Sequence, residues 1–171
     1  QAAKPDAVFA FYPGGMGVNF VKQMNQAGLL PKLPLYSVFT VDGTTLPSLQ
    51  AAAAGTVSGA MWDAALDTPE NKRFVAAFEA KYKRVPSEYA ATAFDAANLL
   101  DIALRKAGGD PKKLAAAVKA AGSELKSVRG PFRFGANNMP VQNYYAFEAV
   151  KSGNNVAVKH VATPLKDHVD T

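Results

Sequence analysis

A glycine-rich turn follows the first apolar segment of the chain, in the stretch Tyr12-Pro13-Gly14-Gly15-Met16-Gly17. An α/β sheet places its ligand crevice where a strand ends and a helix begins, because free N–H groups face the crevice there. The position therefore predicts that Tyr12, Pro13 and Gly14 contact a bound ligand. The alternative is that the glycines serve only a tight turn. A dinucleotide site is disfavoured because Gly-Gly-Met-Gly departs from G-x-G-x-x-G and no acidic ribose-binding residue follows at the right place.

The chain offers no residue pattern that is typical of an enzyme or of a metal site. It contains no cysteine, which excludes thiol nucleophiles and thiolate metal ligands. His160 and His168 lie close to the end of the chain, away from the glycine-rich turn, and we expect them at the surface. The carboxylates on helical stretches need only solvent or capping roles. We therefore expect no catalytic residues, no metal and no cofactor.

The charge pattern argues against a nucleic-acid partner. There are 19 Lys and Arg against 14 Asp and Glu, which gives a net charge of +5. Apart from Lys81, Lys83 and Arg84, and the pair Lys112 and Lys113, the basic residues are scattered singly, without interleaved aromatic residues. We interpret them as solvated helix faces. A basic surface also favours anionic solutes.

The first part of the chain predicts alternating strands and helices. Residues 6–12 form a short apolar run that ends in the glycine-rich turn, and residues 17–27 have helical spacing of apolar residues. A second strand is predicted over 35–41, followed by a helix that starts at Thr44 and includes the alanine run to Ala54. Strand–helix–strand–helix order is typical of a parallel sheet with right-handed crossovers.

Three helices and a β-rich tail are predicted for the rest of the chain. The helices cover residues 68–83, 87–107 and 110–121, with Thr68 and Ser87 as N-terminal capping residues of the first two and Asp110-Pro111 at the start of the third. Strands follow over 132–134 and 143–150, and the turn at 152–155 predicts a hairpin with a last strand over 156–161. No apolar run approaches the roughly 20 residues of a membrane helix.

The ordered set of landmarks resembles a known family. The resemblance rests on four segments: Lys4-Pro-Asp-Ala-Val-Phe9 before the glycine-rich turn, Gly55-Thr-Val-Ser-Gly59, Ala76-Ala-Phe-Glu-Ala-Lys-Tyr82 with Pro86, and Gly130-Pro-Phe132 with Met139-Pro-Val-Gln142. The set resembles the C-terminal half of the type I periplasmic solute-binding proteins of ABC importers, in the branched-chain amino acid and aromatic acid binding family. The resemblance implies an α/β fold with a doubly wound parallel sheet, as part of two lobes that close on a solute.

The resemblance also implies how the chain divides. Residues 1–61 would form part of the C-terminal lobe, residues 62–141 would be a helical segment that completes the N-terminal lobe, and residues 142–171 would return to the C-terminal lobe. An N-terminal half, which supplies the first-lobe strands and most contacts to the solute carboxylate, would then be missing. In its absence we expect exposed apolar side chains on the helices: Phe74, Phe78, Tyr82, Leu100 and Leu104.

The resemblance assigns roles to several aromatic residues. Tyr12 with Pro13 matches a position where an aromatic side chain touches the solute. Phe39 matches the position where the amino acid binders carry a carboxylate for the solute ammonium, and burying an ammonium against a phenyl ring would cost several kcal/mol. The alternatives are that Phe39 is a core residue, and that Asp42 either holds an amine or caps the next helix.

Tyr89 and Trp62 complete the candidate ligand-binding residues. Tyr89 matches a position that lines the pocket for the solute side chain, with helix core as the alternative. Trp62 lies with Asp63 at the expected hinge crossing, where it could cover the cleft or serve as ordinary hinge packing.

The resemblance implies the solute-binding component of an ABC importer, which captures a small aromatic carboxylate such as a benzoate or a phenylpropenoate. Its partners would be the missing half and an ABC permease in the membrane. Its location would be the periplasm, with the signal peptide of the precursor outside these residues. The alternatives are a ligand-sensing domain of a receptor or transcription regulator, a branched-chain amino acid binder, and a nucleotide-using α/β enzyme.

Overall fold

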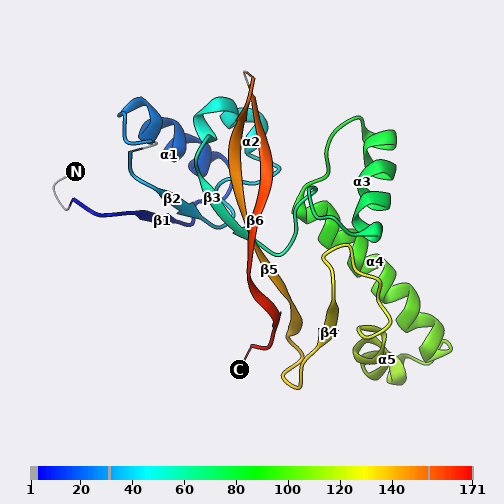
Figure 1. The fold of residues 1–171 in the computed structure, drawn as a ribbon. Helices are drawn as coiled ribbons and strands as arrows, with labels where there is room; N and C mark the ends of the chain where they lie inside the picture. The colour runs from blue at the N-terminus through cyan, green and yellow to red at the C-terminus, as the bar shows by residue number, and fades with distance from the viewer. Residues whose placement is uncertain (1–3, 31, 154, 171) are drawn as a thin grey trace.

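A six-stranded mixed sheet forms the centre of the computed structural model, which describes residues 4–30, 32–153 and 155–170. The strand order is β1-β2-β3-β5-β4, and β6 pairs with the other edge of β5 (Figure 1). β1, β2 and β3 run parallel, whereas β5 is antiparallel to β3, β4 and β6. The strands are β1 (Val8–Ala10), β2 (Leu35–Ser37), β3 (Val57–Ala60), β4 (Phe132–Phe134), β5 (Pro140–Ser152) and β6 (Asn155–His168).

The parallel pairing of β1 with β2 and of β2 with β3 confirms the predicted alternation of strands and helices. Helix α1 (Gly15–Gln26) connects β1 to β2, and the second connection contains α2 (Leu46–Leu49) and the 3-10 turn η1 (Gln50–Ala53). The sequence predicted one helix here, but Gln50 has a left-handed φ of 47°, which ends α2 after four residues.

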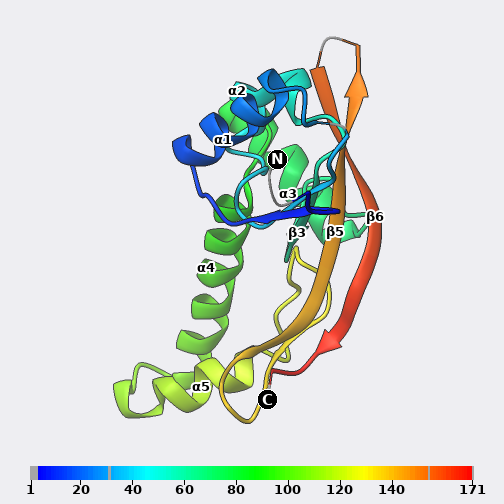
Figure 2. The same cartoon turned by 90° about the vertical axis from the view of Figure 1, so that its left-hand side faces the viewer.

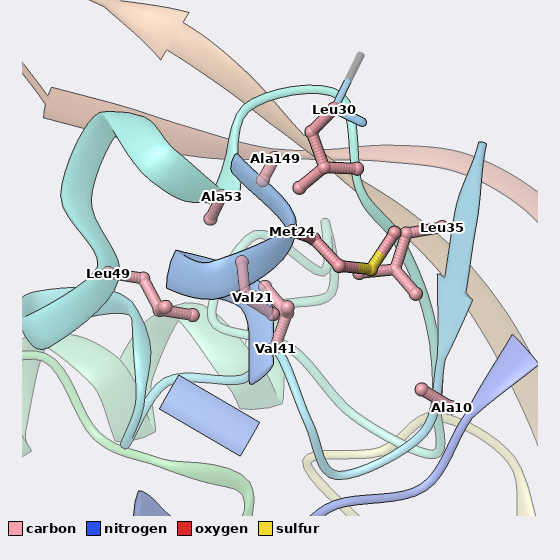
Figure 3. Close-up of a cluster of buried hydrophobic side chains, with 9 residues drawn as sticks. All are labelled: Ala10, Val21, Met24, Leu30, Leu35, Val41, Leu49, Ala53 and Ala149. Carbon is pink, nitrogen blue, oxygen red and sulfur yellow. The ribbon is translucent and has the colours of Figure 1, made fainter. Parts of the chain in front are cut away.

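One hydrophobic core lies between the parallel strands and these helices (Figure 3). Val21 and Met24 on one face of α1 pack against Leu35 of β2, at the helical spacing that the sequence indicated. The other buried members of this cluster are Ala10, Leu30, Val41, Leu49, Ala53 and Ala149. The core therefore fixes the carboxyl ends of β1 and β2 relative to α1.

Three further helices follow a crossing segment, residues 61–68, that leaves β3. They are α3 (Pro69–Tyr82), α4 (Glu88–Ala107) and α5 (Leu114–Ala121), the last preceded by the 3-10 turn η2 (Pro111–Lys113). Thr68 and Ser87 accept hydrogen bonds from the N–H groups of Asn71 and Ala90, at 3.2 and 3.4 Å. Asp110 accepts one from Lys112 N–H at 2.9 Å. These contacts confirm Thr68 and Ser87 as capping residues, and Asp110 caps the turn η2 at the start of the third predicted helix.

A buried polar network ties α4 to the returning strand β5. Asp95 of α4 accepts a hydrogen bond from Arg129 Nε at 2.9 Å, and the same guanidinium donates to Gln142 Oε1 of β5 at 2.9 Å. Ser127 and the N–H of Val128 also donate to Asp95. A charge buried this deeply is tolerated because every oxygen finds a donor. The network holds the start of β5 against the helices.

The predicted β-hairpin is confirmed, and it is longer than expected. β5 and β6 pair from Gln142↔His168 to Ser152↔Asn155, whereas the sequence placed the end of the last strand at residue 161. Figures 1 and 2 show the hairpin running from the end of the molecule that carries α2 toward the end that carries α5.

Several large apolar side chains are exposed on the sheet edge and on the helices. Phe9 of the edge strand β1 is 72% exposed and pairs in register with Tyr36, which is 47% exposed. Tyr82, Leu100 and Leu104 are exposed as expected. The expectation that Phe74 is exposed is wrong, and Phe78 is half-buried, because α3 packs Phe74 against Trp62 and Phe94 at ring distances of 6.0 and 4.8 Å.

Candidate functional site

Three aromatic rings from separate elements meet at the carboxyl ends of β1 and β2. The ring of Phe39 lies 6.2 Å from that of Tyr89, stacked at 28°, and 6.0 Å from that of Phe11, edge-on at 88°. Phe11 follows β1, Phe39 follows β2, and Tyr89 lies in the first turn of α4. Phe11 is 58% and Tyr89 52% exposed, so the three residues form an accessible surface, here named the aromatic face.

The backbone at Phe39 adopts a left-handed conformation, with a φ of 54°. For a bulky side chain this conformation costs about 1–2 kcal/mol, so neighbouring contacts must hold it. Buried Thr40 provides them, because its Oγ1 accepts a hydrogen bond from Tyr12 N–H at 2.8 Å and lies 3.3 Å from the Ala10 carbonyl oxygen. These contacts link the ends of β1 and β2 and aim Phe39 at Tyr89.

The glycine-rich turn lies beside the aromatic face, and its Tyr12 packs elsewhere. The Tyr12 ring contacts Phe20 of α1 at 5.2 Å. Pro13 and Gly14 are exposed, and the first turn of α1 has no side-chain cap, so its N–H groups can bind an acceptor. The contact of Tyr12, Pro13 and Gly14 with a solute remains a prediction. Sequence reasoning missed Phe11. The alternation Phe9-Ala10-Phe11 could have indicated it, because alternate residues of a strand point to the same face, and in the structure both Phe side chains are exposed while Ala10 is buried.

Trp62 lies in the core of the crossing segment and makes no stacking contact with the three rings. It is 3% exposed, its Nε1–H donates to Asn71 Oδ1 at 2.6 Å, and its ring meets Phe74 edge-on at 6.0 Å. This packing supplies the structural role that the sequence left open. Its role as a cover of the cleft stays a prediction.

A cavity of about 650 Å³ borders the aromatic face at Phe39. Its walls come from the loop after β2, from α2, from the crossing segment, from α3 and from the β5–β6 hairpin. Apolar side chains such as Val41, Val75 and Phe147 supply much of the wall. Five carboxylates also line it: Asp42, Asp63, Glu79, Glu88 and Glu148. We name this space the acid-lined cavity.

The electrostatics of the cavity centre on Glu88, which is only 7% exposed. Burial, reinforced by the charges of Asp42 and Asp63, raises the pKa of Glu88 from 4.5 to about 7. Burial likewise raises the pKa of Asp63, against the lowering effects of the Ala65 N–H group and of His160. Sequence reasoning assigned Glu88 only a solvent or capping role, because the distant carboxylates that surround it cannot be recognised from its own neighbours.

The two carboxylate oxygens of Asp42 have different environments: Oδ1 accepts hydrogen bonds within the local turn, and Oδ2 is buried. Its Oδ1 accepts hydrogen bonds from the N–H and the hydroxyl of Thr44, at 2.7 and 2.6 Å, and from Thr45 N–H at 3.1 Å. These bonds stabilise the turn before α2, and the N-terminal capping residue of that helix is Thr45, so the alternative that Asp42 caps it is wrong. Asp42 Oδ2 is buried and has no hydrogen-bond partner.

Exposed aromatic side chains at the carboxyl ends of parallel strands occupy the place where α/β proteins bind their ligands. The chain belongs to the periplasmic binding protein family, whose sequence model matches residues 1–154. The solved relatives place it among the type I solute-binding proteins of ABC transporters. A search of curated proteins found no match.

Three solved structures illustrate the similarity. A solute-binding protein of an ABC transporter from R. palustris, in complex with benzoate, is 37% identical, with a TM-score of 0.82 over 95% of this chain and 44% of its own. A second, from Rhodopseudomonas palustris BisB5 with 3,4-dihydroxybenzoic acid, is 34% identical over 97% and 47% of the two chains, with a TM-score of 0.83. A third, from R. palustris with 4-hydroxybenzoate, is 27% identical over 98% and 47%, with a TM-score of 0.86.

The chain therefore spans less than half the length of these relatives. No helix among the described residues is both long and apolar enough to cross a membrane.

Proposed function

We propose that this chain is part of the solute-binding component of an ABC importer and that it captures a small aromatic carboxylate, of the benzoate or phenylpropenoate class. The observation that carries the proposal is the aromatic face. Phe11, Phe39 and Tyr89 offer apolar ring surface to a flat solute, and aromatic pairs of this kind add about 0.5–1.5 kcal/mol beyond burial alone. Relatives that bind benzoate and hydroxybenzoates support the same class.

Charge around the aromatic face sets the orientation of such a solute. Asp42 and Glu88 lie on the cavity side of Phe39. Two like charges about 4 Å apart repel by about 4 kcal/mol near a protein surface, so the solute carboxylate would point away from the cavity. Its partner would come from the segment of the fold that this chain does not contain.

We propose that this remaining segment covers the exposed apolar surfaces. A strand beside β1 would satisfy its free edge, and a first-lobe sheet would cover Leu100 and Leu104 of α4. The end of β3 at Ala60 supports the proposed boundary at residue 61, and the proposed boundary at residue 141 lies at the start of β5, which begins at Pro140. The complete protein would act without catalysis in the periplasm and deliver its solute to an ABC permease.

Calorimetry on the complete gene product tests the proposal. Benzoate, 4-hydroxybenzoate and cinnamate should bind more tightly than leucine or valine, because Phe39 offers no charge to an α-ammonium. Tighter binding of leucine or valine than of every aromatic acid would favour the branched-chain amino acid alternative. A DNA-binding or membrane-spanning segment in the complete gene would favour the sensor alternative.

A further inference from the structure

Within residues 4–30, 32–153 and 155–170, most acidic side chains without an ion-pair partner line one cavity. Of the 14 Asp and Glu residues, seven form ion pairs with Lys or Arg: Asp67, Glu70, Asp95, Asp101, Asp110, Glu124 and Asp167. Five of the other seven line the acid-lined cavity. In the described part of the chain, no Lys, Arg or His belongs to its wall. A chain with a net charge of +5 therefore places five acidic side chains around one cavity.

Two carboxylate oxygens in this wall are buried without a hydrogen-bond partner. They are Glu88 Oε1 and Asp42 Oδ2, and they are the two such side-chain atoms found in residues 4–30, 32–153 and 155–170. Buried polar atoms are nearly always paired in folded proteins, so an unpaired acceptor in a cavity wall calls for a donor from outside the described chain. Glu88 is itself more than nine-tenths buried.

Charged and titratable groups surround the cavity from every element packed against it. Glu79 faces it from α3, Asp63 from the crossing segment, and Glu148 from β5. Lys159 of β6 lies opposite Glu148 in register, but no ion pair joins them. Burial raises the pKa of Asp63 and the nearby His160 offsets only part of this rise, while burial, followed by the charges of Asp42 and Glu88, raises the pKa of Tyr89. These basic side chains therefore lie outside the cavity wall, and the charged side chains that line the wall are all acidic in the described residues.

We propose that the acid-lined cavity is a binding site for an organic ammonium ion with a short apolar body. The ammonium N–H groups would donate to Glu88 Oε1 and Asp42 Oδ2, while Val41, Val75 and Phe147 would surround the body. Phe39 and Trp62 also border this cavity and add apolar surface to its wall. This site is distinct from the proposed aromatic-carboxylate site, although Phe39 borders both.

The wall suits an ammonium better than a metal ion. A metal needs several oxygen ligands within about 2.0–2.6 Å of one point. In the described residues, no three His, Cys, Asp or Glu side chains come close enough together to form such a site. The carboxylates are instead spread around a volume of about 650 Å³ with apolar surface between them, which matches a charged head and an apolar tail.

The test compares two ligands on the complete gene product. The probe is n-pentylammonium, and n-pentanol is the uncharged control with the same apolar body. Calorimetry at pH 8 should show n-pentylammonium binding at least tenfold more tightly than n-pentanol. Glu88→Gln should weaken n-pentylammonium binding at least tenfold. Asp101→Asn is the matched control, because Asp101 is an exposed acid paired with Arg105 outside the cavity, and it should leave the affinity unchanged.

The pH dependence supplies a second readout that needs no variant. An alkylammonium keeps its charge below a pKa of about 10.4. Glu88 loses its proton as the pH rises past about 7, so the probe should bind more tightly at pH 8 than at pH 6. In Glu88→Gln this difference should shrink.

Several results would overturn the inference: equal binding of n-pentylammonium and n-pentanol, unchanged affinity in Glu88→Gln, or no binding of the probe at millimolar concentration. A crystal structure of the complete gene product with one of its own Lys or Arg side chains in the cavity would also overturn it. Benzoate, titrated separately, tests the proposed function alone, since its failure to bind would leave ammonium binding untouched.

Discussion

Glu88→Gln should stabilise the protein at neutral and alkaline pH. The variant keeps the shape of a side chain that is 7% exposed but removes its charge. The carboxylate lies among Asp42 and Asp63 with one oxygen unpaired, so its ionised form destabilises the folded state. A neutral amide meets neither the charge repulsion nor the full cost of burial.

The pKa of Glu88 sets the magnitude and the sign of this effect. The folded state raises the pKa from 4.5 to about 7, and each pKa unit corresponds to about 1.4 kcal/mol, so the ionised carboxylate costs about 3 kcal/mol. Below pH 4.5 the group is protonated in both states and the penalty is absent. Stability is lost as the pH rises from about 4.5 to about 7, and above that range the penalty is complete.

Urea unfolding at pH 4.5 and pH 8, followed by circular dichroism, measures the effect on the complete gene product. Glu88→Gln should raise the free energy of unfolding by about 3 kcal/mol at pH 8 and change it little at pH 4.5. Asp101→Asn, at an exposed ion pair, should change it by less than about 1 kcal/mol at either pH. A variant that is less stable than the parent at pH 8 would refute the reasoning.

Three further predictions concern the aromatic face, the glycine-rich turn and the uncovered surfaces. Phe39→Ala should weaken benzoate binding by about 1–3 kcal/mol in calorimetry through lost apolar contact; unchanged affinity with lower stability would make Phe39 a core residue only. Gly17→Ala should lower the free energy of unfolding by about 1–3 kcal/mol, because its Cβ would lie 2.1 Å from the Tyr12 carbonyl oxygen. Gly15→Ala, with nothing within 4 Å, is its control, and an equal loss in both would contradict the contact. The isolated 171-residue chain should associate or aggregate in size-exclusion chromatography with light scattering, because β1 is an open edge. A monomer that binds aromatic acids as tightly as the complete gene product would show that no further lobe is needed.

Local signals were sufficient for most of the secondary structure. Thr68, Ser87 and Asp110 cap their helices through atoms only two or three residues away, so a short window of sequence contains the whole interaction. The ends of β1 and β2 were less predictable. Residues 6–12 and 35–41 are mostly apolar, but only three residues of each segment form a strand. Strand pairing depends on residues that are far away in the sequence.

The sequence by itself also determined the family, because the order of landmarks persists over nearly the whole chain, and it singled out Phe39 and Tyr89. Only the tertiary structure decided that these two rings stack and that Phe11, rather than Tyr12, joins them. The acid-lined cavity could not be predicted, because its five carboxylates come from separate segments between residues 42 and 148. Burial and mutual repulsion, which raise the pKa of Glu88, arise only when folding brings those segments together.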